Sequence, residues 1–382
     1  MEHQKVPFNL PYMTGKELTY INDAYMQGKL SGNGQYTQRC QALLKQSVGS
    51  HKVLLTHSCT AALEMAALLC NLAPGDEVIM PSYTFVSTAN AVVLRNAIPV
   101  FVDIRPDTLN INERLIEAAI TPRTKAICVV HYAGVSCEMD EIMAIAQRHN
   151  LLVIEDAAQG YEAYYKGRPL GSIGHFAAMS FHETKNVISG EGGALFVNDA
   201  AYTDLAEIIW EKGTDRSQFF RGIVDKYTWQ HVGSSFLPGE IVAAFLLAQL
   251  EDGRNITNSR LETWQTYHEA FADLEANELL HRPAVPEQCT HNAHMYYVIL
   301  PTADMRNQIL DELKALNINA IFHYIPLHNS PAGLRYTRTN GRMDVTESLS
   351  ARLLRLPMFN FMQDQLRQRV IGAVHEVVRA QQ

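Results

Sequence analysis

Short, continuous apolar runs alternate with segments of helical period along the first half of the chain. An apolar run without polar alternation fits a strand that is buried on both faces, as in a parallel sheet covered by helices. The pattern therefore predicts an α/β fold of βαβ units with a mostly parallel central sheet. The runs cover residues 77–80, 98–102, 126–130 and 151–154.

Beyond residue 185 the pattern changes. A Gly-rich stretch at 189–193 precedes one more apolar run, a long helical passage covers residues 240–275, and a shorter βα pattern covers 296–323. A chain of 382 residues is long enough for two or three domains. We therefore expect a large domain over residues 1–250 and a smaller C-terminal α/β domain over residues 251–382.

Composition excludes several classes of protein. Asp and Glu outnumber Lys and Arg by 40 to 32, a net charge of −8, which argues against nucleic acid or an anionic membrane as the partner. The six cysteines contain no CxxC pair, which is typical of reduced core thiols, so neither disulfides nor a metal site is expected. The chain shows no signal-like segment and no apolar run of membrane-spanning length, so we expect a cytoplasmic protein.

Two carboxylates, Glu155 and Asp156, end the last of the four apolar runs. Open α/β folds bind their ligands at the carboxyl ends of parallel strands. Successive side chains of a strand point to opposite faces, so at most one of the two is expected to enter a site. A solvated acidic turn explains the same two residues equally well.

A lysine, Lys185, follows another apolar run. Ser180, His182, Thr184 and the glycines at 189–193 offer hydrogen-bond donors and close backbone approach to an anionic group. A desolvated lysine has a lowered pKa and forms Schiff bases. A single lysine after a strand is ordinarily a surface residue, but this context makes Lys185 a candidate covalent anchor.

Two further features suit a flat, phosphorylated ligand. Ser58 and Thr60 stand at the start of an expected helix, where free backbone N–H groups and the helix dipole favour a phosphate; a simple N-cap is the alternative. Phe85 follows the strand at 77–80 in an expected loop, where its ring can stack on a flat cofactor, although ordinary core packing is the more common role.

Together, these residues are the groups that a protein needs to bind pyridoxal 5′-phosphate and use its chemistry. A lysine holds the aldehyde of this cofactor, and a carboxylate keeps its pyridine nitrogen protonated so that the ring accepts electrons. A helix start and an aromatic ring bind its phosphate and its flat face.

The order of these motifs resembles the DegT and StrS family of sugar-nucleotide aminotransferases, within the fold-type I aminotransferase superfamily. The resemblance covers nearly the whole chain and implies the fold-type I architecture. Its motifs are Gly28–Gly32, Pro81–Phe85, Phe101–Thr108, His131–Gly134, Glu155–Gln159, Ser180–Lys185 and His323–His328.

The resemblance also implies a role for individual residues. Lys185 corresponds to the lysine that forms the imine, and Asp156 to the partner of the pyridine nitrogen. For the cofactor, it implies that Gln159 contacts the ring hydroxyl, that Phe85 stacks on the ring, and that the phosphate is bound by Thr60, Ala61 and Ser180. For the substrate, it implies that His328 lies near the sugar.

One motif departs from the family pattern. Many members carry Gly-x-Asn-x-Arg, whose Asn reaches the cofactor phosphate of the neighbouring subunit, and the corresponding stretch here is Gly233-Ser-Ser-Phe-Leu237. Ser235 replaces the Asn with a shorter reach and fewer donors. The resemblance still implies a homodimer with active sites at the subunit interface.

The resemblance implies L-glutamate as the amino donor and a dTDP-linked 4-keto-6-deoxy sugar as the acceptor. The configuration at C4 of the product, galacto or gluco, and the nucleotide base are not determined by the residues themselves. Two other functions stay open: a pyridoxal-phosphate-dependent sugar dehydratase, disfavoured because such relatives carry His at the position of Lys185, and a non-enzymatic regulatory or sensor protein.

Overall fold

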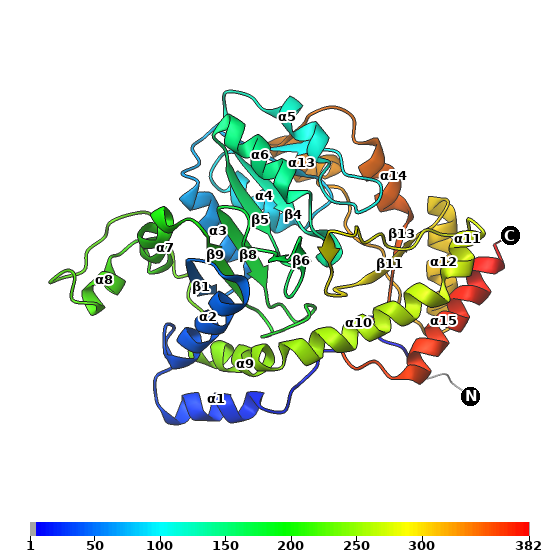
Figure 1. Ribbon diagram of the computed structural model, residues 1–382, viewed down its shortest axis with the longest axis horizontal. Helices are drawn as coiled ribbons and strands as arrows, with labels where there is room; N and C mark the ends of the chain where they lie inside the picture. The colour runs from blue at the N-terminus through cyan, green and yellow to red at the C-terminus, as the bar shows by residue number, and fades with distance from the viewer. Residues whose placement is uncertain (1–4, 382) are drawn as a thin grey trace.

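The computed structural model describes residues 5–381 and is built around one eight-stranded sheet (Figure 1). All neighbouring strands pair in parallel except β9, which is antiparallel to both β1 and β8. The predicted α/β fold with a mostly parallel sheet is therefore confirmed. In spatial order the strands are β1 (Lys52–Thr56), β9 (Gly193–Val197), β8 (Phe176–Ser180), β5 (Leu152–Asp156), β4 (Thr124–Val130), β2 (Glu77–Pro81), β3 (Ile98–Val102) and β12 (Arg338–Thr339).

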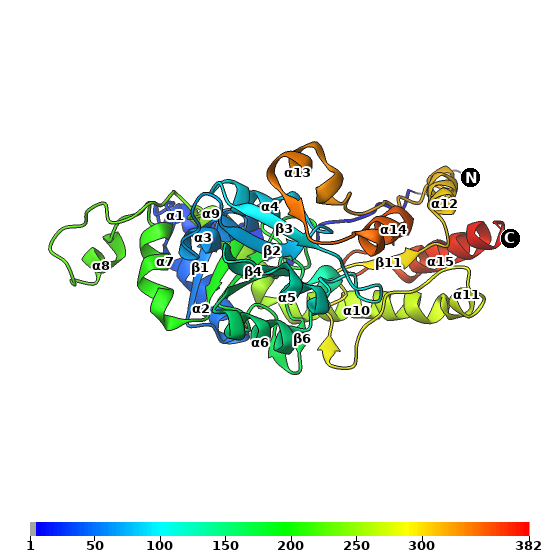
Figure 2. The same cartoon turned by 90° about the horizontal axis from the view of Figure 1, so that it is seen from above.

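Helices cover both faces of this sheet (Figure 2). On one face α3, α4 and α7 pack on strand residues such as Val78 and Met80. On the other face α5 and α6 pack on residues such as Ile79, and α2 and α9 pack on the β1–β9–β8 half. Their bounds, with that of α1, are α1 (Glu17–Met26), α2 (Gln35–Val48), α3 (Cys59–Leu69), α4 (Val86–Val93), α5 (Ile116–Ala119), α6 (Met139–His149), α7 (Thr203–Trp210) and α9 (Glu240–Glu251).

The C-terminal elements build a second apolar cluster around a two-stranded sheet of β11 (Tyr296–Ile299) and β13 (Leu353–Leu356). The long helix α10 runs from α9 toward this cluster (Figure 1). Leu327 and Met343, however, pack with the central sheet, and the division at residue 250 stays a prediction. The remaining elements are α10 (Gly253–Ala270), α11 (Ala272–Ala276), α12 (Ala303–Ala315), α13 (Pro331–Tyr336), α14 (Asp344–Arg352), α15 (Asp364–Arg379) and the short strands β6 (Tyr164–Tyr165), β7 (Arg168–Pro169) and β10 (Cys289–Thr290).

One segment projects away from the rest of the molecule. Helix α8 (Arg216–Phe220) and its flanking loops extend beyond α7 on the side opposite the C-terminal helices, as both views show (Figures 1 and 2). Several large apolar side chains of this segment are exposed, among them Phe220, Ile223 and Trp229.

Among the described residues, none of the helices combines the length and the apolar character needed to cross a bilayer. The cytoplasmic location stays a prediction.

A buried carboxylate anchors the C-terminal segment to the edge of the sheet. Glu77 of β2 is fully buried and accepts hydrogen bonds from Arg338 of β12, at 2.9 and 3.0 Å, and from Arg123 and Thr121, both at 2.7 Å. Burial acts to raise the pKa of Glu77, but these donors outweigh it and lower the pKa below its ordinary value. This contribution to stability is complete above the ordinary glutamate pKa and is lost as the pH falls through the lowered one.

Replacing this carboxylate should destabilise the fold. We expect Glu77→Gln to lower the free energy of unfolding by about 3 kcal/mol, because two guanidinium groups lose their buried counter-charge. Urea unfolding at pH 7 measures the change. The matched control is Glu117→Gln, whose exposed carboxylate pairs with Arg148 and His149 and whose loss should change little. Equal stability of the two variants would contradict the anchoring role of Glu77.

Candidate active site

The candidate residues gather at one edge of the sheet, where β5 and β8 end and where α3 and α4 begin. Asp156 is the last residue of β5 and Ser180 the last of β8. Helix α3 begins three residues after β1, and α4 begins five residues after β2. The parallel order of these strands brings their carboxyl ends together, as the sequence predicts.

Asp156 is buried at this edge and points toward α4. One of its carboxylate oxygens accepts a hydrogen bond from the Thr88 hydroxyl at 2.7 Å, and the other accepts one from the Ala158 N–H at 3.1 Å. Burial raises the pKa of Asp156, while these two donors and the charge of Lys185 oppose the rise. The carboxylate is thus held in one orientation with its remaining lone pairs free for a ligand.

Glu155 points to the opposite face and takes no part in this arrangement. Its carboxylate is fully buried and accepts from His131 Nε2 at 2.9 Å and from the backbone N–H groups at 171, 173 and 174. The Cys137 N–H donates to His131 Nδ1, so the histidine proton lies on Nε2 and faces Glu155. Only Asp156 of the pair faces α4 at the candidate site, in agreement with the alternation of a strand.

Lys185 lies in the turn after β8 and is half-buried. Burial lowers the pKa of its ammonium, the nearby Cys59 and Asp156 oppose this, and the positive charge of Arg355 adds to it. Within residues 5–381 no hydrogen bond or ion pair holds Nζ. The neighbouring Asn186 fixes the turn, since its side chain bonds the Asn292 carbonyl and His294 Nδ1, each at 2.9 Å. A rigid turn therefore presents an amine without a partner.

The start of α3 provides donors for an anion. Ser58 caps the helix by accepting from the Ala61 N–H at 3.1 Å, and the Thr60 hydroxyl contacts that of Ser87 at 2.7 Å. The first turn of a helix leaves N–H groups without intrahelical acceptors, and one cap satisfies only part of them. Ser58 is thus the N-cap that the sequence offered as the alternative, and the other donors of this turn are available to a phosphate.

Gly193 of β9 lets this helix start approach the sheet. A Cβ at Gly193 would lie 2.5 Å from the backbone N of Cys59 and 2.5 Å from the carbonyl carbon of Ser58. No side chain fits at this distance, so the position of the α3 N-terminus depends on glycine here.

Two aromatic rings and an amide lie next to one another beside this site. The Phe85 ring is 56% exposed and lies 6.4 Å from that of Tyr324. The Gln159 amide donates to the Tyr324 hydroxyl at 3.1 Å, and its oxygen accepts from the Ala133 N–H at 2.6 Å. Phe85 is therefore not a core residue, and a flat ligand can pack on its exposed face.

Two more of the predicted residues, His328 and Ser235, have contacts of a different kind. Both ring nitrogens of the buried His328 have protein partners, Ser82 at 2.7 Å and Glu347 at 3.1 Å, and its proposed contact with the sugar stays a prediction. Ser235 is exposed on the strip that follows the projecting segment. Its neighbour Phe236 accepts a backbone hydrogen bond from His57 at 3.0 Å, which places the strip beside the start of α3.

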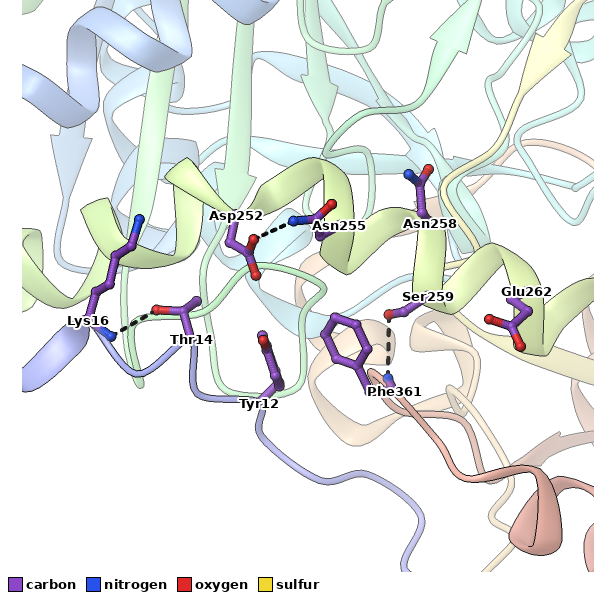
Figure 3. A pocket seen from close by; sticks show the side chains of 9 residues that line it. All are labelled: Tyr12, Thr14, Lys16, Asp252, Asn255, Asn258, Ser259, Glu262 and Phe361. Atoms are coloured by element: carbon purple, nitrogen blue, oxygen red, sulfur yellow. Dashed lines mark hydrogen bonds between the residues drawn. The ribbon is translucent and has the colours of Figure 1, made fainter.

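A cavity of about 510 Å³ lies elsewhere, between the N-terminal segment and α10 (Figure 3). Tyr12, Lys16, Asp252 and Phe361 are among its lining residues, and it contains none of the predicted site residues.

The sequence profile of the DegT/DnrJ/EryC1/StrS aminotransferase family matches residues 11–375. The chain belongs to this family. GDP-perosamine synthase from Caulobacter vibrioides is 33% identical over 96% of this chain and 97% of its own length. Spore coat polysaccharide biosynthesis protein SpsC from Bacillus subtilis is 34% identical over 98% and 97%.

A solved structure of the family bears on the cofactor. The PLP form of Spr1654 from Streptococcus pneumoniae superimposes with a TM-score of 0.88 at 25% identity, covering 99% of both chains. The fold is that of a fold-type I enzyme, and the cofactor is pyridoxal 5′-phosphate. The residues at the sheet edge fit this group: a half-buried amine without a partner, an oriented carboxylate and free donors at a helix start.

Sequence reasoning missed three residues of this site. Thr88 orients Asp156, Tyr324 bonds Gln159, and Asn186 fixes the turn of Lys185. Thr88 follows Thr84 by four residues, and their hydroxyls lie 2.8 Å apart. This spacing of two threonines was the only feature of the sequence that could have indicated a role for Thr88. Nothing local marks Asn186 or Tyr324, because their partners lie more than 100 residues away.

The close approach at Gly193 predicts a defect in cofactor binding. We expect Gly193→Ala to weaken the affinity for pyridoxal phosphate about tenfold or more, because the new methyl group displaces the α3 start; tenfold corresponds to about 1.4 kcal/mol. Titration of the apoprotein with the cofactor measures this affinity. Gly372→Ala in α15, where a Cβ meets no atom within 4 Å, is the control. Wild-type affinity in Gly193→Ala would show that the phosphate does not bind there.

Proposed function

We propose that this aminotransferase moves the amino group of L-glutamate to C4 of dTDP-4-keto-6-deoxy-D-glucose. The products would be 2-oxoglutarate and dTDP-4-amino-4,6-dideoxy-D-galactose, a building block for a bacterial surface polysaccharide. The observation that carries the transamination is the amine of Lys185, half-buried and without a partner, in the electrostatic field of the oriented carboxylate of Asp156.

The choice of sugar rests on motif likeness. The stretches at 58–69, 75–91, 217–229 and 292–295 resemble those of dTDP-4-amino-4,6-dideoxygalactose transaminases. One relative is named GDP-perosamine synthase, a name that contains another nucleotide base. The gluco epimer or another nucleotide keto-sugar is the alternative outcome.

Each residue of the site has a defined task in this proposal. When bound, pyridoxal phosphate supplies an aldehyde that carries the amino group and a ring that withdraws electrons from the carbon losing its proton. Lys185 Nζ would hold the aldehyde, give way to the amino group of the donor, and then move a proton between the donor α-carbon and C4′ of the cofactor. Burial favours the neutral amine that this task requires.

The other residues bind and orient. Asp156, fixed by Thr88 and Ala158, would hold the proton of the pyridine nitrogen. Gln159 would contact the ring hydroxyl and Phe85 would cover the ring. Thr60, Ala61 and Ser180 would bind the phosphate at the start of α3, where the Ala61 N–H would exchange Ser58 for the phosphate as its acceptor. His328 would lie near the sugar.

A second copy of the chain would complete this site. Trp229 and Phe220 of the projecting segment are 79% and 70% exposed. Large aromatic side chains exposed together favour burial against a partner. Phe85, beside the site, is exposed as well. We propose a homodimer in which Ser235 of one copy contacts the cofactor phosphate held by the other.

The two half-reactions can be observed separately. We expect the purified holoprotein to show a visible absorption band of the cofactor, to lose it on addition of L-glutamate and to regain it with dTDP-4-keto-6-deoxyglucose. Lys185→Ala should lower turnover by at least about 1,000-fold, because the proton carrier is lost. The control is Lys166→Ala, an exposed lysine paired with Asp140. A band indifferent to glutamate would contradict the transaminase and favour a dehydratase or a sensor.

Asp156 should matter for chemistry more than for folding. We expect Asp156→Asn to lower the rate of the glutamate half-reaction about 100-fold or more, because an amide does not hold the proton of the pyridine nitrogen. Unfolding should change little, since the Asn oxygen still accepts from Thr88. Stopped-flow absorbance and thermal unfolding measure the two effects. A near-normal rate would show that another group serves the pyridine nitrogen.

A further inference from the structure

Arg260 of α10 is a buried cation that is bonded only to neutral groups. Its side chain is almost fully buried, and no ion pair to its guanidinium occurs within residues 5–381. Nε donates to the Ala293 carbonyl at 2.9 Å, Nη2 to the His294 carbonyl at 2.6 Å, and Nη1 to Oδ1 of Asn360 at 3.0 Å. Burial lowers the pKa of this arginine to about 9, so it still carries its charge at pH 7. Because a cation is costly to desolvate, the segments held by these bonds indicate its role.

The segments held by the guanidinium are those that fix the residue next to Lys185. Asn186 donates through Nδ2 to the Asn292 carbonyl at 2.9 Å and accepts through Oδ1 from His294 Nδ1, also at 2.9 Å. Nδ2 of Asn360 donates to the Asn186 carbonyl at 3.3 Å. All three partners lie at 292–294 or at 360, where the acceptors of the guanidinium lie as well. The arginine is therefore one contact away from the turn of the reacting amine.

The segment at 292–294 also reaches the other side of the site. The Asn292 side chain donates to the backbone carbonyls of residues 159 and 161, at 2.8 and 2.6 Å. Ala293 has a φ of 49°, in the left-handed region that residues other than glycine rarely adopt. The bond from its carbonyl to the guanidinium helps to hold this conformation. The segment thus joins the Lys185 turn to the loop that follows β5.

Resting on the proposed function, we propose that Arg260 is a positioning residue for the amine of Lys185. Each of its nitrogens already donates to the protein, so it binds neither reactant and acts through Asn186. An arginine suits this task because its planar group offers donors in fixed directions, here to three acceptors in two separate segments. With both segments tied to one rigid group, the backbone at 185 keeps its place while Nζ moves between the cofactor and the donor carbon.

Hydrogen exchange and kinetics test this role together. For Arg260→Gln, we expect amide exchange in the peptide 181–190 of the apoprotein to become at least about tenfold faster, while exchange in β4 and β5 keeps the wild-type rate. In the holoenzyme, the rate of bleaching at saturating glutamate should fall about 30-fold, because the proton carrier is misplaced. The glutamate concentration at half-maximal rate should change by less than about threefold. Exchange mass spectrometry and stopped-flow absorbance measure these effects.

A double-mutant cycle shows whether the effect passes through Asn186. Asn186→Ala alone should slow bleaching, and adding Arg260→Gln to it should slow the reaction by less than a further factor of about three, because residues that act as one unit are not additive. If the two factors simply multiply, Arg260 acts by another route and the proposal is overturned.

Three further variants complete the test. Arg306→Gln removes an arginine of α12 that likewise donates to a backbone carbonyl, that of Ala351 at 3.0 Å, and should leave exchange at 181–190 and the bleaching rate unchanged. Arg260→Lys, which keeps the charge and part of the donors, should lie between wild type and Arg260→Gln. If Arg260→Gln does not fold, Arg260→Lys and Asn360→Ala decide by the same readouts.

Two results would overturn the proposal. An unchanged bleaching rate in Arg260→Gln would make Arg260 a purely structural residue, and wild-type exchange at 181–190 would show that it does not hold the turn. Failure of glutamate to bleach the wild type would instead contradict the transaminase. The exchange measurement on the apoprotein tests the hold of Arg260 on the turn independently of that reaction.

Discussion

The hydrogen bond from Thr88 to Asp156 fixes the one carboxylate on which the chemistry of this site depends. It joins the end of β5 to the first turn of α4, and the Ala158 N–H holds the second oxygen. Burial alone would favour the neutral acid, and these donors oppose that tendency. The alternation of β5 sends Glu155 to the other face, where His131 and three backbone N–H groups satisfy it. Strand β5 therefore ends in two carboxylates with different roles: Glu155 is structural, and Asp156 faces the candidate site.

Residues of the C-terminal part of the chain hold two residues of the site in place. Asn186, next to Lys185, is bonded to Asn292 and His294, and Gln159 to Tyr324. Because Asn186 is held by residues more than 100 positions away in the sequence, the turn of Lys185 is rigid. The amine of Lys185 itself has no partner among the described residues. The donors left free at the start of α3 lie at the same edge of an acidic protein, an arrangement that binds an anionic group locally. The phosphate of the cofactor carries negative charge, and so do the two proposed reactants, glutamate and a dTDP sugar.

Local sequence patterns predicted the sheet and the residues at its carboxyl edge, because buried parallel strands are continuous apolar runs and end in ligand-facing positions. Asp156 and Lys185 follow such runs directly. The two-residue strand β12 and the antiparallel pairing of β9 have no signal of this kind. Tyr324 and Asn186 were not predicted either, since their importance arises from partners far away in sequence. His328 was selected by family likeness, and its two ring nitrogens prove to be bonded to Ser82 and Glu347.

The account depends on which amine holds the cofactor. Borohydride reduction of the holoprotein fixes pyridoxal phosphate covalently to that amine, and proteolysis with mass spectrometry then locates the label. We predict a single labelled peptide that contains Lys185, in an amount equal to the bound cofactor. A label on any other lysine, or a reduced protein that releases all its cofactor on denaturation, would contradict the role of Lys185 and the site built around it.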